Sequence, residues 1–317
     1  MKLKYLIIIV LLISVQLSSS AQDKTSLDKM FQTSLEKYQA KQYKQANTIL
    51  DFILEADSAY YEAYLAKVDA LAGEKKFKSA LLYANKALKL KPNDVDAICK
   101  RALLYLRLGQ QQTAKDELGK LLDKNPKSVK ALYHWALIEN RLKNYESAIR
   151  ILTQAKKIES KNLNVLYELG YAYFNTGEDL KAIKQFDKIL KMNPKYQAEG
   201  IYTMRGACKN AMENPIGAIL DYREALKLNP TNSSLYNNIA MIYAYQGKDE
   251  KALKYLNASI KLNNKQGLVF YNRGLSHYQL RHYELAYHDF EKACQLGCKK
   301  REDALGYYQS LKKKLKK

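Results

Sequence analysis

The sequence predicts an all-α protein, a right-handed solenoid of about eight helix-turn-helix repeats followed by a C-terminal capping helix. Three regularities predict this fold. An alanine recurs every 34 residues, and a second small residue stands twelve positions before each alanine. In four repeats a proline stands twelve positions after the alanine. A fixed period of this length is typical of helix pairs that stack on one another and share a continuous core.

The alanine position sets the frame of the repeats. Neighbouring alanines are 34 residues apart, except for one step of 36 residues after Ala182. Because the position stays alanine throughout, we expect it to be a tight packing contact on the second helix of each repeat. The residues are Ala46, Ala80, Ala114, Ala148, Ala182, Ala218, Ala252 and Ala286.

The second small position lies on the first helix of each repeat. Small side chains on two facing helices let the backbones approach closely. Only Val68 departs from this rule. The residues at this position are Ser34, Val68, Ala102, Ala136, Gly170, Gly206, Ala240 and Gly274.

Turn and stop signals separate the predicted helices. Gly109, Gly177 and Gly247 lie between the two small positions of their repeats. Repeat 6 has Asn214-Pro215 there, which is typical of an N-cap followed by proline at the first helical position. Proline after the second helix ends it, and the residues concerned are Pro92, Pro126, Pro194 and Pro230.

The period divides residues 27–300 into eight repeats of one continuous solenoid. Two extra residues fall between Pro194 and Gly206, in the turn that joins repeats 5 and 6. Residues 301–317 have apolar residues at helical spacing among many lysines, so we expect a basic helix that covers repeat 8. The predicted repeats are 27–60, 61–94, 95–128, 129–162, 163–196, 199–232, 233–266 and 267–300.

Residues 166–194 carry the pattern of a known family. Leu166, Leu169-Gly170, Tyr173, Ala182, Phe186 and Pro194 have the spacing of the tetratricopeptide repeat (TPR) family, and the chain resembles that family over about residues 27–300. The resemblance implies that the first helices line a concave groove, which holds an extended peptide or a partner helix.

The resemblance also implies which residues line this groove. They stand three positions before, and one, four and five positions after, the small residue of each first helix. Tyrosine offers rigid contact area and asparagine can bond an extended backbone. The alternative is that some of the 26 tyrosines pack between neighbouring repeats. The candidates are Tyr133, Leu137 and Asn140 in repeat 4, Tyr167, Tyr171, Phe174 and Asn175 in repeat 5, Asn210 in repeat 6, Asn237, Met241 and Tyr245 in repeat 7, and Tyr271 and Tyr278 in repeat 8.

The N-terminus has the layout of a secretory signal peptide. Two lysines precede an apolar run from Tyr5 to Val15, and small residues end at Ala21. We therefore expect cleavage after Ala21, a short linker over residues 22–26, and a periplasmic or secreted protein. The apolar run is shorter than the ~20 residues that span a membrane, which argues against the alternative of an uncleaved anchor.

The net charge of +21 bears on the partners. Lysines are spread over all the repeats rather than gathered in one stripe, so we do not expect a nucleic-acid partner. A diffuse positive field favours acidic proteins, anionic envelope polymers or lipid headgroups.

Motifs for catalysis, cofactors and metals were not found. The sequence has no phosphate-binding glycine loop, no HExxH and no GxSxG. His277, His282 and His288 fall on different parts of repeat 8, so we do not expect them to converge on a metal. Cys294 and Cys298 are spaced for a strained bridge, which stays an open alternative to free thiols.

The sequence thus predicts a non-enzymatic protein-binding scaffold or adaptor that acts in the cell envelope through its concave groove, without a cofactor. The expected partner is a protein or peptide. The alternative is that a basic surface binds anionic envelope polymer or lipid headgroups.

Overall fold

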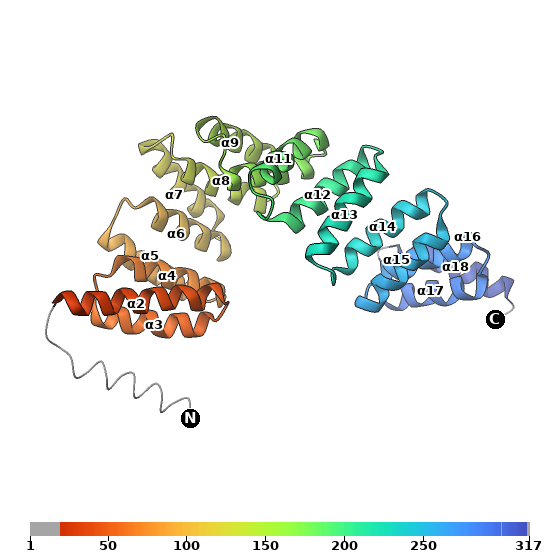
Figure 1. The fold of residues 1–317 in the computed structure, drawn as a ribbon, viewed down its shortest axis with the longest axis horizontal. Helices are drawn as coiled ribbons and strands as arrows, with labels where there is room; N and C mark the ends of the chain where they lie inside the picture. Colours follow the sequence, from red (N-terminus) through yellow and green to blue (C-terminus); the bar gives the residue numbers. More distant parts are fainter. Residues whose placement is uncertain (1–19, 299, 316–317) are drawn as a thin grey trace, which may run out of the picture. The chain divides into compact units, whose positions relative to one another are not determined.

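In the computed structural model, the described residues are 20–298 and 300–315, and all their regular structure is helical. This confirms the predicted all-α class. The described chain forms two compact units. The first contains the residues up to Asn144 together with 157–159, and the second contains residues 145–156 and those from Ser160 onward. Each predicted repeat contains one pair of helices (Figure 1).

The first unit is built from three helix pairs and one further helix. Within each pair the two helices pack on each other, and the first helices of adjacent repeats also pack together, α2 on α4, α4 on α6 and α6 on α8. The helices are α2 (Ser20–Gln39), α3 (Tyr43–Ala56), α4 (Tyr61–Gly73), α5 (Phe77–Leu90), α6 (Val95–Arg107), α7 (Gln111–Lys124) and α8 (Val129–Arg141).

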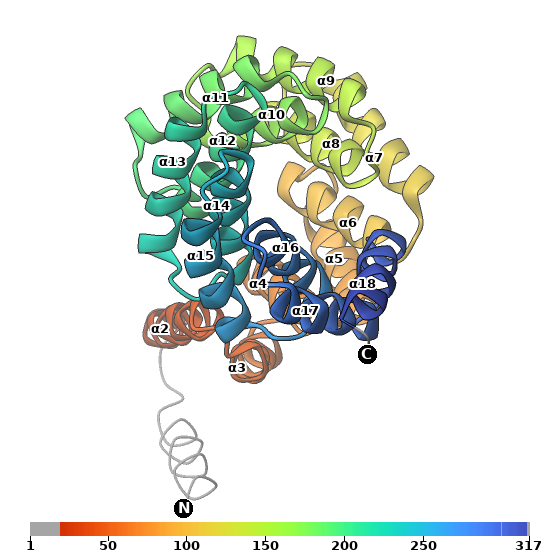
Figure 2. The ribbon, with the colours of Figure 1, turned by 90° about the vertical axis from the view of Figure 1, so that its right-hand side faces the viewer.

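The second unit contains residues 145–156 of α9, the helix pairs of repeats 5 to 8 and the capping helix. Helices α13, α14 and α15 lie side by side in it (Figure 2). Its first helices α10 and α12 pack together, as do α14 and α16. The helices are α9 (Tyr145–Ile158), α10 (Leu163–Asn175), α11 (Asp179–Met192), α12 (Ala198–Ala211), α13 (Pro215–Leu228), α14 (Ser233–Tyr245), α15 (Asp249–Leu262), α16 (Gly267–Gln279), α17 (Tyr283–Gln295) and α18 (Arg301–Lys314).

The repeating small residues are the tightest part of the core. All eight alanines of the frame are 0% exposed. A Cβ added to Gly170 would lie 2.6 Å from the Phe186 ring, and one added to Gly274 would lie 2.9 Å from the Phe290 ring. A larger side chain has no room there. The recurrence of small residues in the sequence therefore reflects a close contact between the two helices that recurs in each repeat.

The turn inside each repeat contains one residue in the left-handed conformation. Gly109, Gly177 and Gly247 have φ of 80°, 74° and 68°. The equivalent residues of the other five repeats are not glycine, and they adopt the same conformation. They are Lys41, Lys75, Lys143, Glu213 and Arg281, with φ of 58°, 61°, 63°, 57° and 63°. The glycine signal therefore revealed only three of eight identical turns.

The two extra residues lie where the sequence places them. Helix α12 has 14 residues where α10, α14 and α16 have 13. It is preceded by Gln197, whose φ of 47° is left-handed. One extra residue thus lengthens the helix and the other is absorbed by the turn. As predicted, Asn214 caps α13 by accepting a hydrogen bond from the Gly217 N–H, with Pro215 at the start of the helix.

The predicted signal peptide and linker fall only partly within the described residues. Residues 1–19 of the predicted signal peptide lie outside the described residues. Residues 22–26, predicted as a linker, belong to α2, because its helix begins at Ser20 and continues to Gln39. In the described part of the chain, no helix is long and apolar enough to cross a bilayer.

Helix α18 covers the end of repeat 8 through aromatic contacts. Tyr307 stacks on Phe290 with ring centroids 4.9 Å apart, and Tyr308 stacks on Tyr287 at the same distance. Ala304 and Leu311 form the buried face of α18. Leu305 is also apolar but is 40% exposed, because it lies one residue past Ala304 on the helix.

Candidate functional site

The candidate groove residues belong to both units, and the first unit presents Tyr133, Leu137 and Asn140 on α8. Asn140 is buried, and Leu137 and Tyr133 are half-buried. The Tyr133 ring contacts the His134 ring edge-on, with centroids 5.0 Å apart. This face is therefore mostly occupied by contacts within the protein.

Paired charges dominate the first helices of this unit. Lys100 on α6 donates to both carboxylate oxygens of Asp69 on α4 at 2.7 Å, and Lys130 on α8 lies 2.8 Å from Asp96 on α6. Burial raises the pKa of Asp69 although the Lys100 ammonium opposes the shift, and burial lowers the pKa of His134. The sequence analysis did not predict these pairs. Opposite charges on the first helices of adjacent repeats would have indicated them.

Helix α8 also carries a buried carboxylate that is fully engaged. Glu139 accepts hydrogen bonds from Trp135 Nε1 at 3.1 Å and Asn144 Nδ2 at 2.8 Å, and Lys115 Nζ lies 2.8 Å away. Burial alone would raise the pKa of Glu139, but these three donors hold it below its usual value. A carboxylate bonded in this way fixes structure and is not available as a general acid or base.

In the second unit, the tyrosines of α10 pack between helices. The Tyr167 ring meets the Tyr196 ring edge-on at 6.2 Å, and Tyr171 meets Tyr145 edge-on at 6.3 Å. Burial raises the pKa of both Tyr167 and Tyr171. The alternative weighed for the tyrosines, packing between repeats, thus describes Tyr171, whose partner Tyr145 belongs to repeat 4. The partner of Tyr167 belongs to the same repeat.

The other α10 candidates are also engaged within the protein. Phe174 is half-buried against the core cluster that contains Phe186. Asn175 is exposed, but its amide donates to the Tyr171 carbonyl oxygen at 2.8 Å. Little of the predicted α10 face is therefore left for a partner.

Helix α14 is different, because its 13 residues, SSLYNNIAMIYAY, include no charged residue. Asn237, Met241 and Tyr245 are spaced four apart and so share one face of the helix. Tyr245 is 83% exposed. Asn272 on the neighbouring α16 donates to Asn237 Oδ1 at 2.9 Å. We call these four residues, Asn237, Met241, Tyr245 and Asn272, the neutral strip.

The candidates on α12 and α16 differ in exposure. Asn210 on α12 is exposed. Tyr271 is only 9% exposed and packs on Phe290, with centroids 5.9 Å apart. Tyr278 contacts Tyr283 at 5.6 Å and Tyr307 of α18 at 5.3 Å. The capping helix therefore occupies the side of α16 where Tyr271 and Tyr278 were expected to meet a partner.

Two arginine–aspartate pairs with buried aspartates, one in repeat 6 and one in repeat 8, were also missed by the sequence analysis. Arg205 forms two hydrogen bonds to Asp221, at 2.6 and 2.8 Å, and a third to Asp187 at 2.5 Å. Arg273 bonds Asp289 in the same two-pronged way. In each case arginine precedes the small residue of the first helix and the acid follows 16 residues later, a spacing that could have predicted the pair.

Two of the three histidines of repeat 8 contact each other, although the sequence places them on a helix and in a turn. The Nδ1 atoms of His277 and His282 lie 3.4 Å apart, and burial lowers the pKa of His277. His288 lies 3.9 Å from Glu291 instead. Within the described residues, no group of three or more histidine, cysteine or acidic side chains is placed to hold a metal ion.

The four cysteines are free, so Cys294 and Cys298 are not bridged in this structure. Cys99 and Cys208 are fully buried, as expected for small apolar residues, and burial raises the pKa of each thiol to about 12. Neither thiol has the thiolate character that a nucleophile needs.

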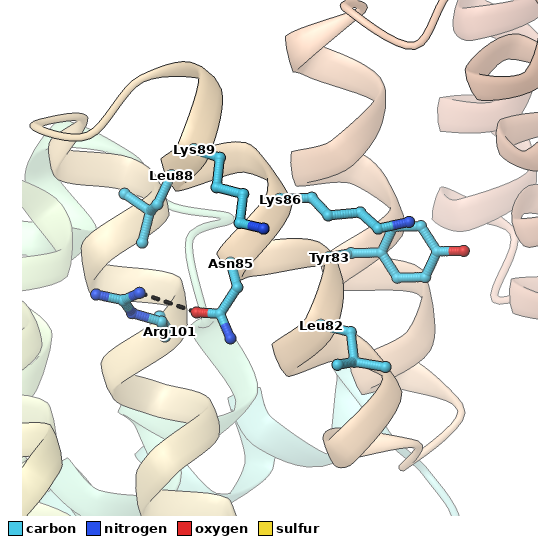
Figure 3. Close-up of a pocket in the computed structure, with 7 residues that line it drawn as sticks. All are labelled: Leu82, Tyr83, Asn85, Lys86, Leu88, Lys89 and Arg101. Carbon is cyan, nitrogen blue, oxygen red and sulfur yellow. Dashed lines mark hydrogen bonds between the residues drawn. The ribbon is translucent and has the colours of Figure 1, made fainter.

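A surface hollow of about 640 Å³ lies on α5 and α6 of the first unit (Figure 3). Arg101 donates to Asn85 Oδ1 at 2.9 Å and is also bound to Glu117, and Lys86 lies 5.0 Å from the centre of the Tyr83 ring. Because these groups are already engaged, the hollow offers little polar chemistry of its own to a ligand. The lining residues are Leu82, Tyr83, Asn85, Lys86, Leu88, Lys89 and Arg101.

Stacked helix pairs of this kind form a scaffold for protein–protein interactions. Tetratricopeptide repeat models match residues 32–95, 164–196 and 221–254, and a model described as anaphase-promoting complex, cyclosome, subunit 3 matches residues 73–155. The chain belongs to the tetratricopeptide repeat family.

Two curated relatives are similar over part of their length. A TPR repeat-containing protein of Methanocaldococcus jannaschii is 26% identical over 244 residues, which cover 72% of this chain and 43% of the relative. Human DnaJ homolog subfamily C member 3 is 26% identical over 217 residues, covering 68% of this chain and 39% of the relative. The chain thus spans about two fifths of the length of these relatives.

Two solved structures share the fold. A chain of the APC/C hetero-tetramer Cut9-Hcn1 matches 85% of this chain and 52% of its own length, with a TM-score of 0.62 and 16% identity. Pseudomonas aeruginosa pilF matches 69% of this chain and 97% of its own, with a TM-score of 0.56 and 18% identity. At this identity the likeness concerns the fold alone.

Proposed function

We propose that the protein is a non-enzymatic binding scaffold of the cell envelope, and that the neutral strip holds an uncharged, extended segment of a partner protein. The observation that carries the proposal is the composition of α14. Charged residues make up 27% of the chain, so a helix of 13 residues would hold about three or four, and α14 holds none.

The absence of charge on α14 suits an interface. Charged residues are depleted at the centre of protein interfaces, where tyrosine and methionine are enriched. Tyr245 is the most exposed of the large apolar and aromatic side chains in the described chain. A large exposed ring beside Met241 gives a partner side chain a rigid apolar surface to cover.

The two asparagines supply the polar part of the strip. An asparagine amide has two donor hydrogens and an oxygen with two acceptor sites. Asn272 is buried, and its bond to Asn237 uses one acceptor site of Asn237, so the half-buried Asn237 amide retains capacity to bond the backbone of an extended peptide. Backbone recognition of this kind favours extended segments over particular side chains.

The proposal is tested with a random peptide library displayed on phage and selected on the full chain. We expect the enriched peptides to be poor in charged residues. Their affinity should fall about 30-fold in Tyr245→Ala, because truncating an aromatic hot spot costs ~2 kcal/mol or more. Leu180→Ala is the matched control, since Leu180 is 69% exposed on the second helix α11.

Salt dependence separates this mode from charge-driven binding. Apolar and neutral hydrogen-bonded contacts change little with ionic strength, whereas exposed charge pairs are screened. We expect peptide affinity to be nearly constant between low and high salt. Selected peptides that are rich in acidic residues, with an affinity that collapses in salt, would contradict the proposal.

The second candidate function is binding of an anionic envelope polymer or lipid headgroup, and one lysine cluster favours it. Lys156 donates to the Gln185 amide oxygen at 2.8 Å, and Lys188 donates to the Ser160 carbonyl at 2.6 Å. Burial lowers the pKa of Lys156, and the neighbouring Lys188 and Lys184 lower it further. An anion bound there would relieve that repulsion.

The anionic candidate predicts binding of polyphosphate, used as a soluble polyanion. Binding should weaken in Lys156→Gln/Lys188→Gln and fall steeply with salt. The matched control is Lys254→Gln, an exposed lysine on the second helix α15. Equal weakening by the control would indicate diffuse charge rather than this cluster.

The envelope location rests on the N-terminal sequence. Sequencing the N-terminus of the native protein should give Gln22, the residue after the predicted cleavage site. A membrane-bound species that retains Met1 would contradict the location while leaving the neutral strip untouched.

A further inference from the structure

The first helix of every repeat ends in the same hydrogen-bonded turn. In repeat 4 the Asn144 N–H donates to the Glu139 carbonyl at 2.9 Å, and in repeat 8 the His282 N–H donates to the His277 carbonyl at 2.8 Å. The residue just before the donor is left-handed in both, Lys143 and Arg281. This is the Schellman arrangement at a helix C-terminus, in which the third-last helical residue and the second residue beyond the cap lie close together.

The turn brings the two side chains together as well as the two backbones. In repeat 4 the Asn144 amide donates to the Glu139 carboxylate at 2.8 Å across the turn. The same two positions hold imidazoles in repeat 8, and there the Nδ1 atoms of His277 and His282 lie 3.4 Å apart. The pairing of these rings thus follows from a backbone motif that all eight repeats share.

The distance between the two nitrogens fits two metal ligands better than a hydrogen bond. An N–H donor and its acceptor are usually about 2.7–3.2 Å apart. Two imidazole nitrogens on a tetrahedral Zn²⁺, each about 2.0–2.1 Å from the metal, are separated by about 3.3–3.4 Å. An octahedral ion with ligands at right angles would require about 3.0 Å at the same bond length.

We propose that His277 and His282 chelate a zinc ion through their Nδ1 atoms, with two coordination positions left to water. His282 is exposed, so the ion can enter from solvent. The nearby guanidinium of Arg273 is already bound by Asp289, at 2.7 and 2.8 Å, which limits its repulsion of a cation. A zinc ion there would link the end of α16 to the start of α17.

The proposal is tested by titrating Zn²⁺ into the full chain with calorimetry. We expect a saturable site of one equivalent that weakens at least tenfold in His282→Gln and in His277→Gln. His288→Gln is the matched control, because it removes an exposed imidazole of α17 without touching the pair, and it should bind as wild type. If the His277→Gln variant does not fold, the His282→Gln variant, which changes an exposed residue, decides the test by itself.

Cobalt distinguishes binding by the histidine pair from binding by Cys294 and Cys298, which follow in the sequence. Co²⁺ adopts the same tetrahedral geometry, and thiolate ligands add a near-ultraviolet charge-transfer band that imidazole and water do not. We expect tetrahedral visible bands without the thiolate band, and the same spectrum in Cys294→Ser. No saturable site in wild type, undiminished binding in His282→Gln, or a thiolate band that disappears in Cys294→Ser would each overturn the proposal.

Discussion

Eight left-handed residues form the turns inside the repeats, and five of them carry a side chain. For an L-residue this conformation costs roughly 1–2 kcal/mol. Glycine adopts it freely but loses roughly 0.5–1 kcal/mol more backbone entropy on folding. Each non-glycine turn therefore stores a small strain that the surrounding helix contacts hold in place.

Replacing one of these residues with glycine should stabilise its repeat. For Lys75→Gly, at φ 61°, we expect the free energy of unfolding to rise by about 0.5–1 kcal/mol. This is the difference between the cost of the left-handed conformation for lysine and the entropic cost of glycine. The measurement is the midpoint of denaturant unfolding. Lys78→Gly, on the exposed side of α5, is the control and should lose about 1 kcal/mol instead. A loss at both positions would show that the turn is not strained.

The alanine frame gives a second prediction at this scale. Ala182 is 0% exposed, so Ala182→Leu has to displace neighbouring helices and should cost ~1–3 kcal/mol. Lys181→Leu changes the adjacent exposed residue and should have little effect. Comparable unfolding midpoints for the two variants would refute a packing role for the alanine.

At the scale of the element, arginine–aspartate pairs take the place of uncharged residues in some repeats. Arg205 occupies in repeat 6 the position that Leu169 occupies in repeat 5, and Asp221 occupies the position of Gln185. Asp221 is 4% exposed and contacts both Arg205 and Lys209. Removing its charge would leave two partly buried cations without their shared carboxylate.

We therefore expect Asp221→Asn to destabilise repeat 6 by about 3–5 kcal/mol, the usual cost of breaking a buried ion pair. Asp187→Asn removes a carboxylate that is 55% exposed and should cost about 1 kcal/mol or less. The double variant Arg205→Leu/Asp221→Gln copies the pair of repeat 5 and should recover most of the loss. Hydrogen exchange of the α12 and α13 amides reports the change locally, and equal exchange in both single variants would contradict the account.

Helix pairs were predictable because their signals recur along the chain. The alanine and small positions specify the contact inside each pair, and Asn214-Pro215 specifies a helix start. What the sequence did not show is which neighbour each aromatic side chain packs on. Tyr271 and Tyr278 have the spacing of groove residues, yet Tyr271 contacts Phe290 of α17 and Tyr278 contacts Tyr307 of α18.

The histidine pair was missed for a related reason. His277 and His282 were assigned to a helix and a turn and judged separately. The Schellman hydrogen bond closes the chain between them and brings their rings together. Recognising the turn in all eight repeats, and not only in those with glycine, would have predicted the contact.

At the scale of the whole molecule, helix α14 differs in chemistry from the first helices of the first unit. In the first unit they carry charge pairs, Asp69 with Lys100 and Asp96 with Lys130. In the second unit α14 carries no charge, and its exposed face is aromatic, thioether and amide. The chain has a net charge of +21, yet α14, the first helix of repeat 7, contains no charged residue.

The most direct test of the central claim is photo-crosslinking from the neutral strip. A photoreactive residue is placed at Met241, and in a second variant at Leu180 on the second helix of repeat 5. Each variant is then irradiated with the same saturating library-selected peptide. The account predicts a crosslinked complex from position 241 and only background from position 180. Equal yields from the two positions, or no complex from position 241 while the peptide is bound, would contradict it.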